Sequence, residues 1–300
     1  MELLIALPWN FNFRRTAISH GWYDLPPFEL DQDNWRLTRV IDFGKPRPVT
    51  VAISPADGGV KVEAKQTPGA RAMEKVAHDV RHMLRLDDDL TEFYEVTRAE
   101  PNFEWIAATG AGRLLRSPTV FEDLVKTLCT TNCSWALTDK MVNALVDLLG
   151  RQTADGRRSF PTAEAMAEMP VRFYRDKVRA GYRAPYLKEL ATRVSKGEID
   201  PESWLASDLP TAELRREMKQ VKGVGDYAAE NLLRLVGRYD VLALDSWVRA
   251  KFARTRNGAR KASDKKIERY YAKFGKWNGL AFWCDMTCDW LEDTSTPREW

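Results

Sequence analysis

The chain has 300 residues, of which 44% are apolar and 11% aromatic, and this length is sufficient for one large or two ordinary cores. No apolar run approaches the roughly 18 residues that cross a bilayer, and the start of the chain lacks the basic flank and small-residue cleavage site of a secretion signal. We therefore expect an intracellular protein without membrane contact, in the cytoplasm or nucleoid if it is bacterial. A net charge of +3 permits nucleic acid binding without requiring it.

The first 88 residues predict a small antiparallel sheet and one helix. Three β-branched stretches are typical of strands, and the last two are joined by Pro55–Gly58, a good hairpin turn. A helix is predicted over Ala70–Leu84, because its apolar residues recur at three and four positions. The predicted strands are Trp35–Asp42, Pro48–Ser54 and Gly59–Ala64. We expect residues 1–88 to form an amino-terminal α/β domain.

From about Leu90 onward the strand pattern disappears, and periodic segments separated by Pro, Gly and Ser-Asp predict an all-α domain over residues 89–300. The predicted class is therefore α+β, with the two parts packed together and no flexible tether. The predicted helices are Ser117–Thr131, Trp135–Leu149, Ala163–Met169, Ala184–Lys196, Ala212–Val221, Tyr227–Gly237, Asp245–Ala253, Asp264–Lys273 and Gly279–Leu291.

One of these helix connections has the composition of a phosphate-binding hairpin. Gly223 and Gly225 have no side chain and can take positive φ, so a phosphate can approach the backbone N–H groups and the positive end of the next helix. Val224 between them is expected to anchor the hairpin in the core. An ordinary glycine-rich connection is the alternative, but the basic Lys219 and Lys222 before the turn favour strand binding.

An aspartate, Asp245, follows Gly225 by twenty positions and opens the next predicted helix. With this spacing the sequence resembles the helix-hairpin-helix DNA glycosylase superfamily, and most of all its 8-oxoguanine and 3-methyladenine glycosylase II branches. Arg249 follows in a similar Asp-x-x-Val-x-Arg turn, one position early for that pattern. Further similar segments occur in the family's order at Gly112–Pro118, Leu128–Asn132, Gly181–Tyr186 and Gly279–Trp283.

The resemblance implies a base-excision-repair enzyme that flips a damaged purine from duplex DNA and hydrolyses its N-glycosidic bond, with Asp245 as the catalytic carboxylate. An aspartate at a helix start is also an ordinary N-cap, and the two roles are compatible. Some family members use a lysine two residues after the second hairpin glycine to form a Schiff base. Tyr227 stands there in this sequence, so we expect a monofunctional enzyme.

The other expected site residues bind DNA or line a base pocket. The resemblance places Lys222, Gly223, Val224, Gly225, Asn132, Tyr182, Arg183 and Arg249 at DNA, and Tyr227, Trp247, Phe282, Trp283 and Met286 around the extruded base. Each aromatic residue is equally well explained as core. Phe282 stands where the 8-oxoguanine branch has an amide, which favours recognition by stacking and tilts the expectation slightly toward an alkylated or electron-poor purine.

No cofactor is expected, apart from a monovalent cation as a candidate ligand of the hairpin at Gly223–Gly225. Only Cys284 and Cys288 follow the hairpin, so we expect no iron-sulfur cluster and no metal. The expected partner is double-stranded DNA with a damaged base, bound by a monomer. A bifunctional 8-oxoguanine glycosylase/lyase and a non-catalytic helix-hairpin-helix DNA-binding protein remain the alternatives.

Overall fold

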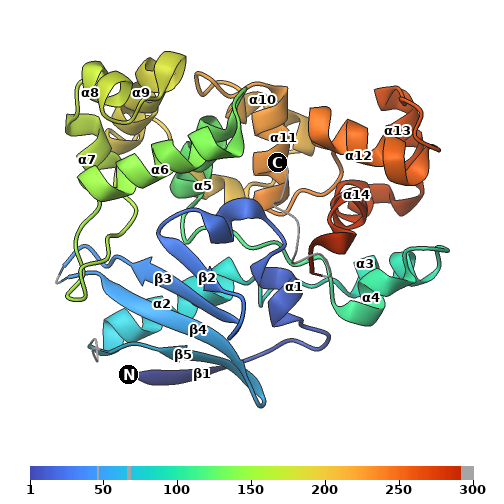
Figure 1. The fold of residues 1–300 in the computed structure, drawn as a ribbon, viewed down its shortest axis with the longest axis horizontal. Helices are drawn as coiled ribbons and strands as arrows, with labels where there is room; N and C mark the ends of the chain where they lie inside the picture. The colour runs from blue at the N-terminus through green and yellow to red at the C-terminus, as the bar shows by residue number, and fades with distance from the viewer. Residues whose placement is uncertain (46, 66–68, 292–300) are drawn as a thin grey trace. The chain divides into compact units, whose positions relative to one another are not determined.

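The fold was analysed in a computed structural model that describes residues 1–45, 47–65 and 69–291. A five-stranded antiparallel sheet lies near the amino terminus, and the remainder is mostly helical (Figure 1). The predicted α+β class is therefore confirmed. Across the described ranges, no helix combines the length and the hydropathy that spanning a bilayer demands.

The sheet has the strand order β1-β5-β4-β3-β2, and every neighbouring pair is antiparallel. The three predicted strands are confirmed, and Gly58, with φ +78°, makes the expected tight turn between the last two. Two outer strands were not predicted, and one of them starts at the chain's second residue. The strands are β1 (Glu2–Ala6), β2 (Phe28–Asp31), β3 (Arg36–Ile41), β4 (Val49–Ala56) and β5 (Gly59–Glu63).

The predicted helices are present, with one correction. The segment Gly279–Leu291 is not one helix, because Thr287 leaves helical geometry (φ −115°, ψ 11°) and a short 3₁₀ turn, Cys288–Leu291, follows. The predicted helices correspond to α2 (Ala70–Met83), α5 (Val120–Thr130), α6 (Trp135–Leu149), α7 (Ala163–Glu168), α9 (Ala184–Ser195), α10 (Thr211–Met218), α11 (Asp226–Leu235), α12 (Ser246–Arg256), α13 (Asp264–Tyr271) and α14 (Asn278–Met286). Four short helices were not predicted: α1 (Phe13–Ala17), α3 (Thr91–Arg98), α4 (Glu104–Thr109) and α8 (Val171–Asp176).

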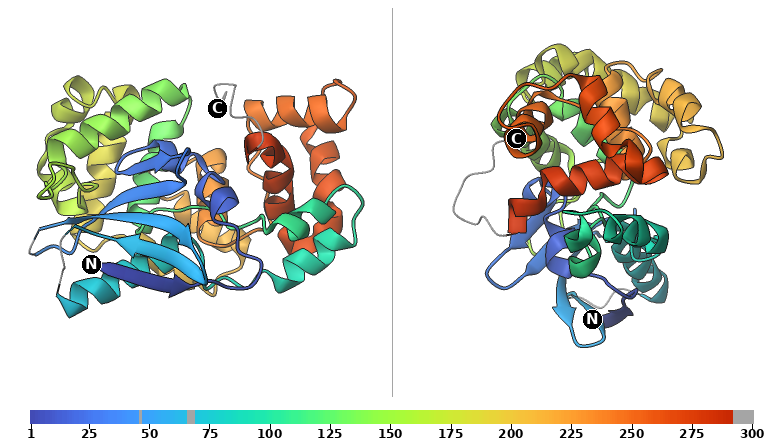
Figure 2. Two further views of the ribbon diagram at one scale, coloured as in Figure 1. Left: turned by 60° about the horizontal axis from the view of Figure 1, so that its bottom comes forward. Right: turned by 90° about the vertical axis from the view of Figure 1, so that its right-hand side faces the viewer.

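The chain forms two compact units that do not follow sequence order. Unit 1 comprises residues 1–88 and 113–203, and unit 2 comprises residues 89–112 and 204–300, of which the last nine lie outside the described residues. Within unit 2, α14 packs against both α12 and α13 (Figures 1 and 2). These units are defined by contacts, so the division into folding domains at residue 88 stays a prediction.

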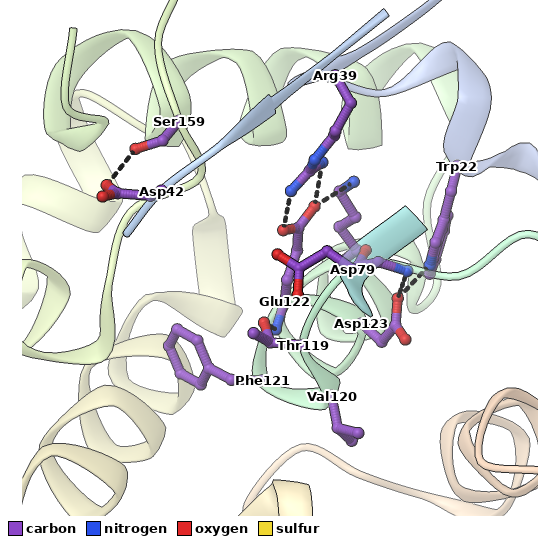
Figure 3. A network of polar contacts seen from close by, with 12 residues as sticks. Trp22, Arg39, Asp42, Asp79, Thr119, Val120, Phe121, Glu122, Asp123 and Ser159 are labelled. Atoms are coloured by element: carbon purple, nitrogen blue, oxygen red, sulfur yellow. Dashed lines mark hydrogen bonds and ion pairs between the residues drawn. The ribbon is translucent and has the colours of Figure 1, made fainter. Parts of the chain in front are cut away.

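In unit 1 the sheet is joined to α5 by a buried charge cluster of Arg39, Glu122 and Lys126, of which Arg39 and Glu122 are labelled in Figure 3. Arg39 donates to both oxygens of Glu122, at 2.9 and 2.5 Å, and the Lys126 ammonium lies 2.7 Å from Glu122 Oε1. Burial alone would raise the pKa of Glu122, but the two cations hold it below its ordinary value. The cluster thus fixes α5, the helix that leads to Asn132.

A second buried carboxylate, Asp123, lies beside this cluster. Its Oδ1 accepts hydrogen bonds from Trp22 Nε1 at 2.7 Å and from the Ser117 backbone N–H at 2.9 Å. Burial nevertheless raises the pKa of Asp123 to about 6. The start of α5 is therefore held by a carboxyl group that ionises less readily than an exposed aspartate.

Candidate functional site

The predicted site residues fall into two groups, one in each compact unit. In unit 2 the hairpin joins α10 to α11. Gly223 has φ +92°, a left-handed conformation in which a side chain would be strained. Gly225 has φ −89° and caps α11, so the expected positive φ holds at only one of the two glycines. Val224 is 5% exposed, which confirms that it anchors the turn in the core.

The outer surface of the hairpin is open. A Cβ placed on Gly225 would meet no atom within 4 Å, and Lys222, Gly225 and Asp226 are all exposed. The first N–H groups of α11 have no partner within the helix, and the helix dipole adds partial positive charge there. This surface has the shape and polarity that a phosphate group requires.

Charged side chains around the hairpin are paired with each other. Asp226 Oδ1 lies 2.5 Å from Lys219 Nζ and 3.1 Å from Arg215 Nη2, and these cations lower the pKa of Asp226. Arg215 also reaches Glu230 at 2.6 Å. Lys219 is therefore engaged by an acid in this structure and becomes available to a phosphate only when that ion pair opens.

Asp245 is the N-cap of α12. Its Oδ1 accepts the Val248 N–H at 2.8 Å, and the residue is half-buried in extended geometry (φ −121°, ψ −173°). The predicted capping role is confirmed. The bond involves only one carboxylate oxygen, so the cap fixes the side chain in place and leaves Oδ2 outside this interaction. A carboxylate held in this way is suited to stabilise positive charge on a nearby sugar.

The segment from Arg254 to Arg269, which includes the end of α12 and most of α13, is strongly basic. It contains seven arginines and lysines against two acids, a net charge of +5 in a chain whose total is +3. Most of these cations are exposed. Arg249, which precedes the segment, forms a bidentate ion pair with Asp264 at 2.8 and 3.1 Å. Its predicted contact with DNA stays a prediction.

Some of the predicted base-pocket residues belong to a cluster of tryptophan rings, and others are buried in the core. Trp247 contacts the rings of Trp283 and Trp290, with centroids 6.3 and 6.0 Å away, and we call these three residues the tryptophan cluster. Phe282 and Met286 are fully buried, and the Phe282 ring packs edge-on against Tyr271. In this structure Phe282 and Met286 are core residues, so their contact with an extruded base stays a prediction.

Arg234, which was not among the predicted site residues, lies next to this cluster. It is on α11, only 2% exposed, and its guanidinium carbon lies 3.8 Å from the centre of the Trp283 ring. It donates to the side-chain oxygen of Asn231. In the sequence Arg234 follows an apolar run in an ordinary helix, and no local pattern marks it as buried.

In unit 1 the structure brings together Asn132, Tyr182 and Arg183. Asn132 Nδ2 lies 3.3 Å from the Tyr182 hydroxyl, and both residues are exposed. Asn132 has φ +47°, a conformation that asparagine tolerates better than most residues. These two residues form a small polar surface just beyond α5.

Arg183 is buried and bonded to the end of α5. It is 4% exposed, its Nε lies 3.2 Å from Thr131 Oγ1, and it also donates to the Thr131 carbonyl. The guanidinium lies over the Tyr182 ring at 4.5 Å. In this structure Arg183 fastens its loop to the end of α5, and its contact with a base opposite the lesion stays a prediction.

Within residues 1–45, 47–65 and 69–291, no three His, Cys, Asp or Glu side chains are grouped as a metal ion would need. His78 and His82 are stacked at 6.3 Å, and burial lowers the pKa of His82 to about 3. All four cysteines are free thiols.

Comparison with known proteins identifies the fold. No family model matches the chain. A DNA-3-methyladenine glycosylase of Bacillus subtilis is 23% identical over 164 residues, which cover 53% of this chain and 54% of that protein. The chain thus spans about half the length of this curated relative.

Solved structures extend the match to nearly the whole chain. A 3-methyladenine DNA glycosylase from Archaeoglobus fulgidus aligns with a TM-score of 0.74 at 20% identity, covering 99% of this chain and 100% of that one. The Clostridium acetobutylicum 8-oxoguanine glycosylase/lyase, bound to double-stranded DNA with cytosine opposite 8-oxoguanine, aligns with a TM-score of 0.73 at 21% identity, over 95% and 93%. The chain therefore has the fold of the helix-hairpin-helix DNA glycosylases, as the motifs indicated.

Proposed function

We propose that the protein is a DNA glycosylase of base excision repair that removes a damaged purine from double-stranded DNA. The observation that carries this proposal is Asp245, fixed by its own helix twenty residues after a hairpin with an open backbone surface. The shared fold supports it, since the similar proteins are named as 3-methyladenine and 8-oxoguanine glycosylases. The exposed basic segment from Arg254 to Arg269 supports binding to a polyanion.

In the proposed reaction the hairpin holds one strand by its phosphates, and the damaged nucleotide leaves the stack. The bond between C1′ and the base nitrogen breaks, its electron pair leaves with the base, and positive charge develops on the sugar. The Asp245 carboxylate stabilises that charge and accepts a proton from the water that adds to C1′. That proton then passes through water to a base that left as an anion, or to the solvent if the base left neutral, which restores the Asp245 carboxylate. The products are a free base and an abasic site, and the proposed reaction uses no cofactor.

We propose that the enzyme is monofunctional, because Tyr227 has no amine with which to attack the sugar. Tyr227 is half-buried in the first turn of α11. Without an imine, the strand beside the abasic site stays intact. The alternative is a bifunctional 8-oxoguanine glycosylase/lyase, in which a lysine such as Lys222 would have to supply the amine.

A duplex panel tests the reaction and separates these two enzymes. Labelled duplexes with 8-oxoguanine, methylated purines, uracil or hypoxanthine are incubated with the protein and analysed with and without alkali. A monofunctional glycosylase gives cleaved strand only after alkali, whereas a lyase gives it without alkali. If no base is released from any duplex, the glycosylase proposal is wrong.

The cap of α12 is the observation that favours a non-catalytic DNA-binding protein. The Asp245–Val248 bond is a sufficient structural reason for an aspartate at this position. A protein of this kind would bind the whole panel through phosphates and release no base. The same panel, with duplex binding measured in parallel, distinguishes the two functions.

A further inference from the structure

Arg234 is a buried cation on the side of α11 that faces the core. Its helix neighbours Leu232, Leu233 and Leu235 are at most 1% exposed, and Arg234 itself is 2% exposed. Arginine is rarely buried to this extent unless a specific partner holds it. Here the partners include the Asn231 side chain and the face of the Trp283 ring.

The tryptophan cluster connects this cation with the candidate catalytic residue. Trp283 packs against Trp290 at 5.7 Å and against Trp247 at 6.3 Å, and Trp247 lies two residues after Asp245. The Arg234 guanidinium covers one face of the Trp283 ring, with its carbon 3.8 Å from the ring centre. A face covered in this way is not open for stacking with a second cation.

The charge of Arg234 is retained at neutral pH. Burial lowers the pKa of Arg234 to about 10, and the nearby Tyr227 and Asp245 oppose that shift. A pKa near 10 leaves the guanidinium protonated at pH 7. Asp245 therefore shares its surroundings with a fixed, poorly solvated positive charge.

A positive charge near Asp245 has opposite effects on the release of cationic and of neutral damaged bases. An N-alkylated purine such as 7-methylguanine is cationic in DNA and leaves as a neutral base, so a nearby guanidinium repels its ground state. A neutral lesion such as 8-oxoguanine carries carbonyl oxygens and leaves with the electron pair of the broken bond. The negative charge that develops on this leaving base is stabilised by a cation.

We propose that Arg234 is a specificity-determining residue that makes the site select neutral damaged purines and disfavour cationic N-alkylpurines. This inference rests on the proposed glycosylase function and names the substrate class of the same site. It opposes the slight tilt, drawn from Phe282, toward an alkylated or electron-poor purine. A unit charge several Å away at the effective dielectric of a protein corresponds to discrimination on the order of 10- to 100-fold.

The test uses two duplexes that differ only in one lesion, 8-oxoguanine or 7-methylguanine, each opposite cytosine. Single-turnover release is measured for each base and divided by its uncatalysed loss, and the ratio of the two enhancements is compared between proteins. The wild type is expected to favour 8-oxoguanine. Arg234→Met, which removes the charge but keeps an unbranched side chain, is expected to shift the ratio toward 7-methylguanine by about tenfold or more.

Arg234→Lys is the matched control because it keeps the charge, and its ratio is expected to stay close to that of the wild type. A purely structural role for Arg234 would slow both reactions alike and leave the ratio unchanged. An unchanged ratio in a folded Arg234→Met protein overturns the inference. A wild type that enhances 7-methylguanine release more than 8-oxoguanine release also overturns it, even if the variant does not fold. Release of neither base contradicts the proposed function itself.

Discussion

The hairpin offers a substitution that separates DNA binding from folding. Gly225 has φ −89°, which any residue adopts, and a methyl group there would meet no atom of the protein within 4 Å. Alanine is a poorer N-cap than glycine, but it also restricts the unfolded chain. These effects oppose each other, so Gly225→Ala should change the free energy of unfolding by less than about 1 kcal/mol.

The same methyl group would stand where a phosphate is proposed to approach the backbone. We expect Gly225→Ala to raise the Kd for duplex DNA about tenfold or more, equivalent to roughly 1.4 kcal/mol. The assay is fluorescence anisotropy with a labelled duplex at one fixed salt concentration, paired with thermal unfolding of the free protein.

Gly223→Ala is the comparison, because φ +92° strains an alanine and should cost about 1–2 kcal/mol of stability even without DNA. Gly225→Ala is thus expected to lose affinity at full stability, whereas Gly223→Ala loses stability as well. If Gly225→Ala binds duplex as tightly as the wild type, the DNA strand does not lie on this surface.

Three further predictions concern charge and the nucleophile. Because burial raises the pKa of Asp123 to about 6, ionising this carboxyl group destabilises the fold as pH rises from about 4 to 6, so wild-type stability should fall over this range relative to that of Asp123→Asn. At neutral pH Asp123→Asn should be about 1–3 kcal/mol more stable than the wild type. Equal pH profiles in chemical unfolding would contradict this. Asp226→Asn releases Lys219 from its ion pair, so the affinity for duplex DNA should rise. The slope of log affinity against log salt concentration should steepen by roughly one. An unchanged slope would mean that Lys219 does not reach a phosphate. Borohydride should trap no adduct between the wild type and an abasic duplex, whereas Tyr227→Lys should form one. A trapped wild-type adduct would establish lyase chemistry.

Local sequence patterns predicted much of the fold. The bounds of α6 match the prediction, because Ser134 and Gly150 flank a regular apolar stripe. β1 was missed, since its place in the sheet depends on pairing Glu2–Ala6 with Gly59–Glu63, far along the chain. A short apolar stretch contains no information about such a distant partner.

In the candidate site, too, local sequence patterns predicted some features, whereas features that depend on distant residues were missed. The spacing from Gly225 to Asp245 is a sequence property, and Asp245 caps its helix as predicted, whereas Gly225 lacks the expected positive φ. Arg234 could not have been identified in this way, because its burial depends on Trp283, forty-nine residues later, whose ring covers it. Likewise, the burial of Arg183 follows from its bonds to Thr131 and not from its own neighbours in the loop.

The proposed function depends most directly on Asp245 as the carboxylate that breaks the glycosidic bond. Asp245→Asn keeps an oxygen that can accept the Val248 N–H, so α12 should remain capped while the negative charge is lost. Asp240→Asn, an exposed aspartate in the same unit, is the control.

The decisive measurement is single-turnover base release from the best duplex of the panel, with duplex Kd measured on the same proteins. We expect Asp245→Asn to bind duplex within about threefold of the wild type but to release base at least on the order of 100-fold more slowly, while Asp240→Asn is unaffected. Release by Asp245→Asn at the wild-type rate would show that Asp245 is a helix cap alone.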